Sequence, residues 1–196
     1  MKEPLLYKVI RPILYVWYTF KIKPIVINKE YIPKKGRCLL AGNHTNNLDC
    51  ITLWYGTKRC IRSVAKDELT KGVKGYFFKI MGIVPVNRKI HDKTVIPTCV
   101  NLLNNESIVG IFPEGTINKT KDIIMPFKKG VVVMAMETNS PIIPFAINGK
   151  YKKGKLKIIF GKPYYITSKD VNREIEVLED KVVELMKSIG DNLWIL

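Results

Sequence analysis

The sequence has few of the residues that hold metals or form disulfide frameworks. Its two histidines, His44 and His91, lie far apart in the chain, and its carboxylates form no cluster. Its four cysteines include no Cys-x-x-Cys pair, and three of them fall in apolar runs. We therefore expect no bound metal or other bound cofactor, no disulfide, and reduced, mostly buried thiols as in a cytosolic protein.

Long apolar runs are also missing. Segment 4–20 is apolar and aromatic, but Lys8 and Arg11 interrupt it, and it is shorter than the ~20 apolar residues of a membrane span. No small-residue cleavage site follows it, so we expect no signal peptide. The chain shows no internal repeat and no low-complexity linker, and 196 residues are enough for one domain with a sizeable core.

Acidic residues are scarce. The 17 Asp and Glu residues stand against 33 Lys and Arg, a net charge of +16, whereas 46% of the residues are hydrophobic. A folded, basic chain suggests an acidic partner, such as a membrane surface, a nucleic acid, or an anionic substrate or carrier protein. Lysine far outnumbers arginine and the aromatic residues gather at the N-terminus. This disfavours a nucleic acid, because nucleic-acid-binding proteins interleave aromatic and arginine side chains or carry a helix-turn-helix.

Segment 4–20 has the pattern of an amphipathic helix. One face, with a spacing of three or four residues, carries Lys8, Arg11, Tyr15 and Tyr18. The remaining surface is apolar and carries Leu5, Leu6, Val9, Ile13, Val16, Trp17 and Phe20. The pattern predicts a helix at an anionic membrane interface, with apolar side chains in lipid and with Lys8 and Arg11 on the opposite, headgroup side. The alternative is a helix packed on the protein's own core.

Short apolar runs that suit strands alternate with helical patterns along the rest of the chain. This alternation is typical of an α/β domain with a central mixed, largely parallel sheet flanked by helices. We expect strands at 25–27, 38–41, 60–65, 83–86, 107–112, 142–147 and 156–160. We expect helices at about 49–55, 72–81, 92–104, 130–136 and 170–189, with Asp92 as the cap of the third.

Stretch 38–49 reads as a strand, a polar turn and the start of a helix. An apolar run ends at Gly42, five polar residues follow, and a helical pattern resumes at Leu48. On one continuous helix His44 and Asp49 would lie about 140° apart. They can meet only with His44 in the turn and Asp49 in the first helical turn, where the helix dipole also favours a carboxylate. Asp49 would then hold one imidazole nitrogen and leave the other to take a proton.

Other interpretations fit the same residues. Asn43 and Asp49 can simply cap a helix, with His44 as a surface loop residue. Cys50 can act as a nucleophile paired with His44. If the chemistry forms an oxyanion, the backbone N–H groups of 43–46 are the candidate donors.

Five more residues follow predicted strands in the same way. They are Lys66, Arg88, Glu114, Gly115 and Thr116. The carboxyl ends of neighbouring parallel strands share one edge of a sheet, so we expect these residues to converge beside His44 and Asp49. Cations and backbone N–H groups bind phosphate, and a base beside them suits a phosphorylated substrate that carries a hydroxyl. Taken singly, Lys66 and Arg88 are ordinary surface charges.

These residues fall in segments that resemble the glycerolipid acyltransferases, most closely the bacterial 1-acyl-glycerol-3-phosphate acyltransferases. Asn43-His44 with Asp49 is similar to the first motif of that family, H-x-x-x-x-D. The family's lysine segment resembles Ala65-Lys66-Asp67-Glu68-Leu69, and its second motif resembles Gly82-Ile83-Val84-Pro85-Val86-Asn87-Arg88. Its third motif resembles Phe112-Pro113-Glu114-Gly115-Thr116, and its fourth resembles Ile142-Ile143-Pro144-Phe145-Ala146-Ile147. The four motifs span 39–147. One departure is Ile117-Asn118, where the family usually has Arg-Ser; Lys119 or Lys121 would have to supply that charge.

Segment 1–24 is the interfacial helix that its pattern predicts, and the resemblance implies an enzyme whose acyltransferase catalytic domain is 25–196. It implies that His44 and Asp49 are catalytic and that Lys66, Arg88 and the 114–116 turn bind the substrate phosphate, with Glu114 ordering that turn or a cation. The acceptor would be 1-acyl-glycerol-3-phosphate and the product phosphatidic acid. The co-substrate would be acyl-CoA or an acidic acyl carrier protein. The protein would lie on the cytoplasmic face of the cell membrane, peripheral or monotopic, on anionic phospholipid.

Three alternatives stay open from the sequence. The first is an acyltransferase that acts on another lysophospholipid. The second is a hydrolase that uses the same His-Asp pair to activate water on thioesters or lipids. The third is a lipid-binding module without catalysis, which would have no use for a His-Asp pair beside a phosphate site.

Overall fold

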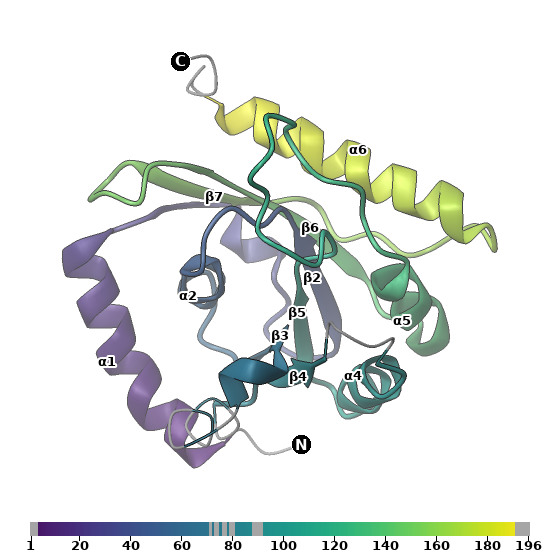
Figure 1. The fold of residues 1–196 in the computed structure, drawn as a ribbon, viewed down its shortest axis with the longest axis horizontal. Coiled ribbons are helices and arrows are strands. Elements are labelled where there is room, and N and C mark those ends of the chain that lie inside the picture. Colours follow the sequence, from purple (N-terminus) through teal and green to yellow (C-terminus); the bar gives the residue numbers. More distant parts are fainter. Residues whose placement is uncertain are drawn as a thin grey trace.

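A sheet of seven strands forms the centre of the protein (Figure 1). The computed structural model describes residues 4–70, 72, 75, 78, 81–87 and 92–190. In chain order, the strands in these residues are β1 (Ile25–Ile27), β2 (Cys38–Gly42), β3 (Ile61–Lys66), β4 (Val84–Val86), β5 (Ile108–Ile111), β6 (Ile142–Gly149) and β7 (Leu156–Phe160). The helices are α1 (Leu5–Lys21), α2 (Asp49–Tyr55), α4 (Val95–Asn104), α5 (Gly130–Thr138) and α6 (Val171–Ile189), with 3₁₀ turns η1 (Lys29–Tyr31) and η2 (Asp67–Thr70).

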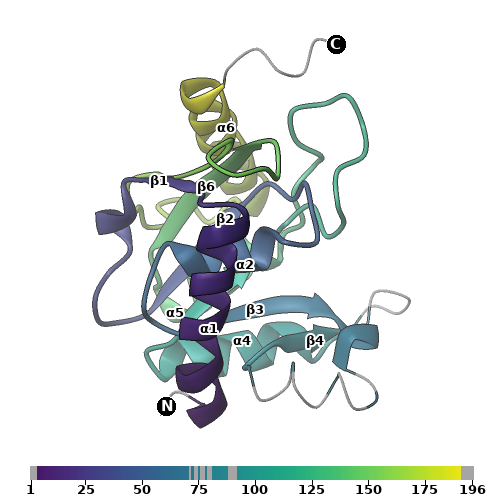
Figure 2. The same cartoon turned by 90° about the vertical axis from the view of Figure 1, so that its left-hand side faces the viewer.

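The sheet is mixed and largely parallel, as the sequence predicts. The described strands lie in the order β1-β7-β6-β2-β5-β3-β4, and among them only the β6–β7 pair is antiparallel. The carboxyl ends of β2, β5, β3 and β4 therefore share one edge. Figure 2 shows this edge at the right, with the long loop between β5 and α5 projecting from it.

Helices cover both faces of the sheet, and each face has one large hydrophobic core. α1 and α2 lie on one face, and α4, α5 and α6 lie on the other (Figure 1). Burial on both faces explains why the sequence of β2 is apolar without alternation. Leu40 packs into the core under α1 and α2, whereas Leu39 and Ala41 pack into the core under α4 to α6. A central parallel strand is buried on both faces and has no polar side to show.

Helix α1 both packs on the core and exposes an apolar row. Tyr7, Tyr18 and Ile22, which follows the helix, are buried in the first core. Five exposed apolar side chains, the exposed α1 row, lie on the outer side of the helix: Val9, Ile13, Val16, Trp17 and Phe20. Ile13 is 63% exposed and Phe20 74% exposed. Within the described residues, we find no helix long and apolar enough to cross a membrane.

The predicted polar face of this helix is wrong at Arg11 and Tyr18, whereas Tyr15 is 41% exposed. Arg11 does not point to headgroups, because its guanidinium donates to the carbonyl oxygens of Trp54 and Thr57, at 3.3 and 2.5 Å. Tyr18 is fully buried, and its hydroxyl lies 2.5 Å from Thr52 Oγ1. Both side chains have a long apolar part and a polar end. The apolar part can therefore pack against α2 and the loop after it, while the polar end forms hydrogen bonds there. Lys8 is exposed as predicted.

Other predicted boundaries hold to within a few residues, with one clear error. α4 begins at Val95 rather than 92. Asp92 does not cap it: the carboxylate accepts hydrogen bonds from Asn87 N–H and from Thr94, and so closes the loop after β4. Asp170 does cap α6, accepting from two backbone N–H groups of the first turn. The predicted helix 72–81 lies mostly outside the described residues.

Candidate active site

The candidate site begins where β2 ends against β6. At Gly42 a Cβ atom would lie 2.1 Å from the carbonyl oxygen of Phe145, so only glycine allows the strands this approach. Asn43 is buried, and its side chain makes two hydrogen bonds to the backbone of Ile147: Nδ2 donates to the carbonyl at 2.9 Å, and the N–H donates to Oδ1 at 2.8 Å. Asn43 therefore anchors the turn to β6 and does not cap a helix.

His44 and Asp49 meet as the sequence predicts, with His44 in the turn and Asp49 at the start of α2. His44 Nδ1 lies 2.8 Å from Asp49 Oδ2. The imidazole stacks on the ring of Phe112, with centroids 4.3 Å apart and planes 22° apart. The carboxylate and the aromatic ring fix the orientation of the imidazole and leave Nε2 as the nitrogen that can take a proton.

Hydrogen-bond donors surround the carboxylate of Asp49, which is fully buried. Besides His44, Oδ2 accepts from the backbone N–H groups of Thr45, at 2.6 Å, and Asn46, at 2.8 Å. Oδ1 accepts from the hydroxyl of Tyr151, in the hairpin between β6 and β7, and from Thr45 Oγ1 at 3.4 Å. These donors offset the cost of burying an anion and hold it in one orientation.

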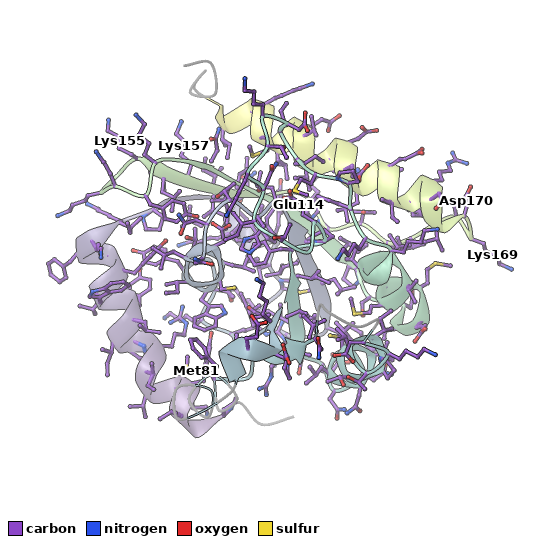
Figure 3. All side chains as sticks on the ribbon, viewed as in Figure 1. Met81, Glu114, Lys155, Lys157, Lys169 and Asp170 are labelled. Carbon is purple, nitrogen blue, oxygen red and sulfur yellow. The ribbon has the colours of Figure 1, made fainter. Side chains whose placement is uncertain are left out.

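Glu114 ties the loop after β5 to the His44 turn. It is 3% exposed, and Figure 3 labels it near the middle of the molecule. Its Oε1 accepts from His44 N–H at 2.6 Å and its Oε2 from Met125 N–H at 3.0 Å. Burial raises the pKa of Glu114, and the two backbone N–H donors oppose that rise. Each carboxylate oxygen of Glu114 thus accepts a backbone N–H, and the side chain joins the His44 turn to the loop after β5.

A pocket of about 370 Å³ opens beside the imidazole. Its lining is His44, Asn47, Cys50, Val64, Ala65, Lys66, Glu68, Phe112, Thr116, Ile117 and Lys119. Lys66, Thr116 and Lys119 therefore do converge on His44 from the ends of β3 and β5. Of the two lysines that could replace the missing arginine, Lys119 lines the pocket and Lys121 does not. Gly115 has a φ of +75°, which lets the turn reverse after Glu114.

Other residues that the sequence analysis named for the site are not placed as it predicts. Arg88 lies outside the described residues, as does His91. The N–H groups of His44, Thr45 and Asn46 cannot serve as oxyanion donors, because they already donate to Glu114 and Asp49. Cys50 lines the pocket beside His44. The four cysteines lie in the part of the chain that the structure describes; no disulfide joins them, and three of them are buried.

Tyr151 is the residue that the sequence does not reveal. It lies 102 positions from Asp49 in the chain, within a lysine-rich hairpin that carries no recognisable pattern. Only the antiparallel pairing of β6 with β7 brings it back to the turn after β2. Burial and the nearby Asp49 carboxylate raise the pKa of Tyr151, so the phenol stays protonated and remains a donor.

Comparisons with known proteins show the family to which this chain is similar. The acyltransferase family profile matches residues 23–148. A 1-acyl-sn-glycerol-3-phosphate acyltransferase of Bacillus subtilis is 34% identical over 182 residues, which cover 82% of this chain and 90% of that protein. The protein of the same name from Borreliella burgdorferi is 32% identical over 129 residues, covering 64% of this chain and 51% of that protein.

One solved structure also resembles this fold. The crystal structure of PlsC, the 1-acyl-sn-glycerophosphate acyltransferase of Thermotoga maritima, superimposes with a TM-score of 0.74 at 22% identity. The match covers 95% of this chain and 81% of that one. At this identity the match shows a shared fold, which includes an α/β sheet and the helix α1.

Proposed function

Because this chain belongs to the acyltransferase family, we propose that it transfers a fatty acyl group from a thioester to the free hydroxyl of 1-acyl-glycerol-3-phosphate. The product would be phosphatidic acid, which enters phospholipid biosynthesis. The names of the relatives from Bacillus and Borreliella support this acceptor. The observation that supports the proposal is the His44–Asp49 pair beside a pocket with two lysines, because such a pair can act as a base and the lysines suit an anion.

In the proposed reaction His44 Nε2 removes the proton of the acceptor hydroxyl as its oxygen attacks the thioester carbonyl. Asp49 holds Nδ1–H and stabilises the imidazolium. The tetrahedral intermediate then expels the thiolate, which takes the proton back from His44. A base placed in this way typically contributes about 10²–10⁴-fold to the rate. The acceptor oxygen is itself the nucleophile, so the enzyme needs no acyl-enzyme intermediate.

The phosphate of the acceptor would lie between the ends of β3, β4 and β5. Lys66 and Lys119 line the pocket at two of these ends, and Thr116 lies beside them. Arg88, which follows β4, is the proposed third cation. Charge-assisted contacts of this kind contribute about 1.5–3 kcal/mol each. The apolar residues of the pocket, Val64, Ala65, Phe112 and Ile117, leave room for the start of an acyl chain.

The donor would be acyl-CoA or an acyl carrier protein, each an anion suited to a chain of net charge +16. We also propose that the protein is peripheral, on the cytoplasmic face of the membrane. The exposed α1 row supports this, because a row of large apolar side chains in contact with water is costly unless lipid covers it.

A single assay tests the reaction. A labelled acyl thioester is incubated with lysophosphatidate and the purified protein, and labelled phosphatidate and free fatty acid are both measured. We expect label in phosphatidate. Label in free fatty acid alone would identify a hydrolase, and label only on a different lysophospholipid would identify another acceptor. No turnover with any thioester would contradict the proposed function.

A further inference from the structure

A second pocket, here called the groove, lies away from the candidate active site, between α1 and the segment that carries η1. It has a volume of about 840 Å³. Pro12, Tyr15 and Val16 of α1 form one wall, and Tyr55 and Gly56 at the end of α2 lie next to them. In Figure 2 the segment with η1 lies to the left of α1. Val16 also belongs to the exposed α1 row, so the groove is continuous with that row.

The groove is rimmed by cations. Lys29, Lys34 and Lys58 line it, are exposed, and form no ion pair with any residue that the structure describes. Glu30 is the carboxylate in the lining. Arg11 and Arg59 also line the groove, but their guanidinium groups donate to backbone carbonyl oxygens. The three lysines are therefore the cations that remain available to a ligand.

The groove lies at the opposite edge of the sheet from His44. Lys34 precedes β2, and Lys58 precedes β3, so both lie at the amino ends of parallel strands. His44 follows the carboxyl end of β2. A ligand in the groove is therefore separate from the acceptor and from the thioester that must reach His44.

We propose that this groove binds a membrane phospholipid with a net negative headgroup. The lysines Lys29, Lys34 and Lys58 hold the headgroup phosphate, and the first carbons of the acyl chains lie against Pro12, Tyr15 and Val16. A lipid fits because the apolar wall runs on into the exposed α1 row, which would face the bilayer. An acidic carrier protein fits less well, because it must deliver its thioester at the other edge of the sheet. This binding adds to the proposed function and does not depend on it.

Vesicle sedimentation tests the groove. The full chain, a variant with Lys29→Gln, Lys34→Gln and Lys58→Gln, and a control with Lys162→Gln, Lys169→Gln and Lys187→Gln are mixed with vesicles of phosphatidylglycerol and phosphatidylcholine, or of phosphatidylcholine alone. The control lysines are exposed and lie on or before α6, and Figure 3 places Lys169 at the end of α6 away from α1. Each cation at an anionic surface is worth about 1 kcal/mol, so the groove variant should bind anionic vesicles about 100-fold more weakly.

The outcomes are distinct. We expect the control to bind anionic vesicles almost as the parent does, and all three proteins to bind phosphatidylcholine alike. Equal losses in both variants would show diffuse attraction by net charge and overturn the proposal. It would also fail if the groove variant lost affinity for inorganic phosphate and not for anionic vesicles, because free phosphate would then be the ligand. Weaker binding of acyl carrier protein with unchanged vesicle binding would assign the groove to that protein instead. Transfer to a short-chain soluble acceptor should be the same in all three.

A different observation carries a second inference. The geometry points to Tyr151 as a positioning residue for the His44–Asp49 pair. Its hydroxyl donates to Oδ1 of Asp49, on the opposite side of the carboxylate from His44. The hairpin that carries Tyr151 is itself fixed, because Gly154 N–H donates to the carbonyl of Ile22 at the end of α1, at 2.8 Å. Asp49 is thus held between the backbone of its own turn and a side chain from the far hairpin.

Tyr151→Phe removes this donor with little change in volume. We expect kcat to fall roughly 10-fold, which corresponds to the low end of the free energy of a hydrogen bond to a charged group. The KM of both substrates should stay unchanged. In an Asp49→Asn background the same change should cost much less, because its effect acts through the carboxylate. The control is Tyr164→Phe, because the buried hydroxyl of Tyr164 has no hydrogen-bond partner among the described residues. Equal effects of Tyr151→Phe in both backgrounds, or a fall in thermal stability without a fall in kcat, would overturn the inference.

Discussion

Replacing Asp49 with asparagine separates its two tasks, which are to orient His44 and to stabilise the charged imidazolium. The amide has one oxygen, and in the place of Oδ2 it can still accept from His44 Nδ1 and from the N–H groups of Thr45 and Asn46. The amide nitrogen then faces Tyr151, whose hydroxyl can turn to accept. The turn should therefore keep its shape, and the imidazole its orientation.

What the variant loses is the negative charge 2.8 Å from the imidazole. A hydrogen bond to a charged group contributes about 1.5–3 kcal/mol, so kcat for acyl transfer should fall roughly 10–150-fold. The KM values should hardly change, because Asp49 is fully buried and does not line the pocket. The free energy of unfolding should fall by less than about 1 kcal/mol, since the backbone donors keep their acceptor.

Steady-state kinetics with the labelled thioester, together with denaturant unfolding, measures all three quantities. Asp49→Ala gives the contrast, because it leaves the buried N–H groups of Thr45 and Asn46 unpaired at about 1–3 kcal/mol each. Asp122→Asn, at an exposed carboxylate, controls for the change in net charge. If Asp49→Asn raised the acceptor KM and left kcat unchanged, Asp49 would act on binding and the reasoning would be refuted.

Three further predictions follow from the same contacts. Arg88→Ala should raise the KM for the acceptor roughly 10–150-fold with little effect on the donor KM, and the reverse pattern in the kinetics would show that Arg88 is misassigned. Gly42→Ala should lower the free energy of unfolding by about 1–3 kcal/mol or prevent folding, because its Cβ overlaps Phe145, whereas Gly130→Ala, with open space at the Cβ position, should not destabilise the protein. Burial raises the pKa of Glu114 above its ordinary value of 4.5, so its contribution to stability is complete below pH 4.5 and is lost as the pH rises through the folded-state pKa. As the pH rises through that pKa, the free energy of unfolding should therefore fall less in Glu114→Gln than in the parent protein. Denaturant titrations that give the two proteins the same dependence of stability on pH would contradict this.

Local signals explain which parts of the fold could be predicted. The strand, turn and helix at 38–55 are marked by an apolar run, a glycine and a polar turn, and the structure places β2 and α2 almost where those signals put them. The pairing of His44 with Asp49 follows from that geometry, because only one placement allows a spacing of five. The start of α4 was less predictable, since Asp92 can close a loop as readily as it can cap a helix.

Contacts between distant parts of the chain could not be predicted. The partner of Arg11 is a pair of carbonyl groups near the end of α2, and no pattern in segment 4–20 indicates them. Asn43 looks like a cap in sequence, but β6 offers it a peptide group across the sheet. Tyr151 reaches Asp49 only through the packing of three strands. In each case the polar group finds its partner through tertiary packing, which local periodicity does not encode.

The central claim is that His44, held by Asp49, removes the proton from the acceptor hydroxyl. The most direct test is single-turnover transfer of a labelled acyl group from thioester to lysophosphatidate by His44→Ala, compared with the parent protein under the same conditions. We predict that phosphatidate forms about 10²–10⁴-fold more slowly, while the far-ultraviolet circular dichroism and the affinity for lysophosphatidate stay the same. Formation of phosphatidate at nearly the parent rate by a folded His44→Ala protein would contradict the account.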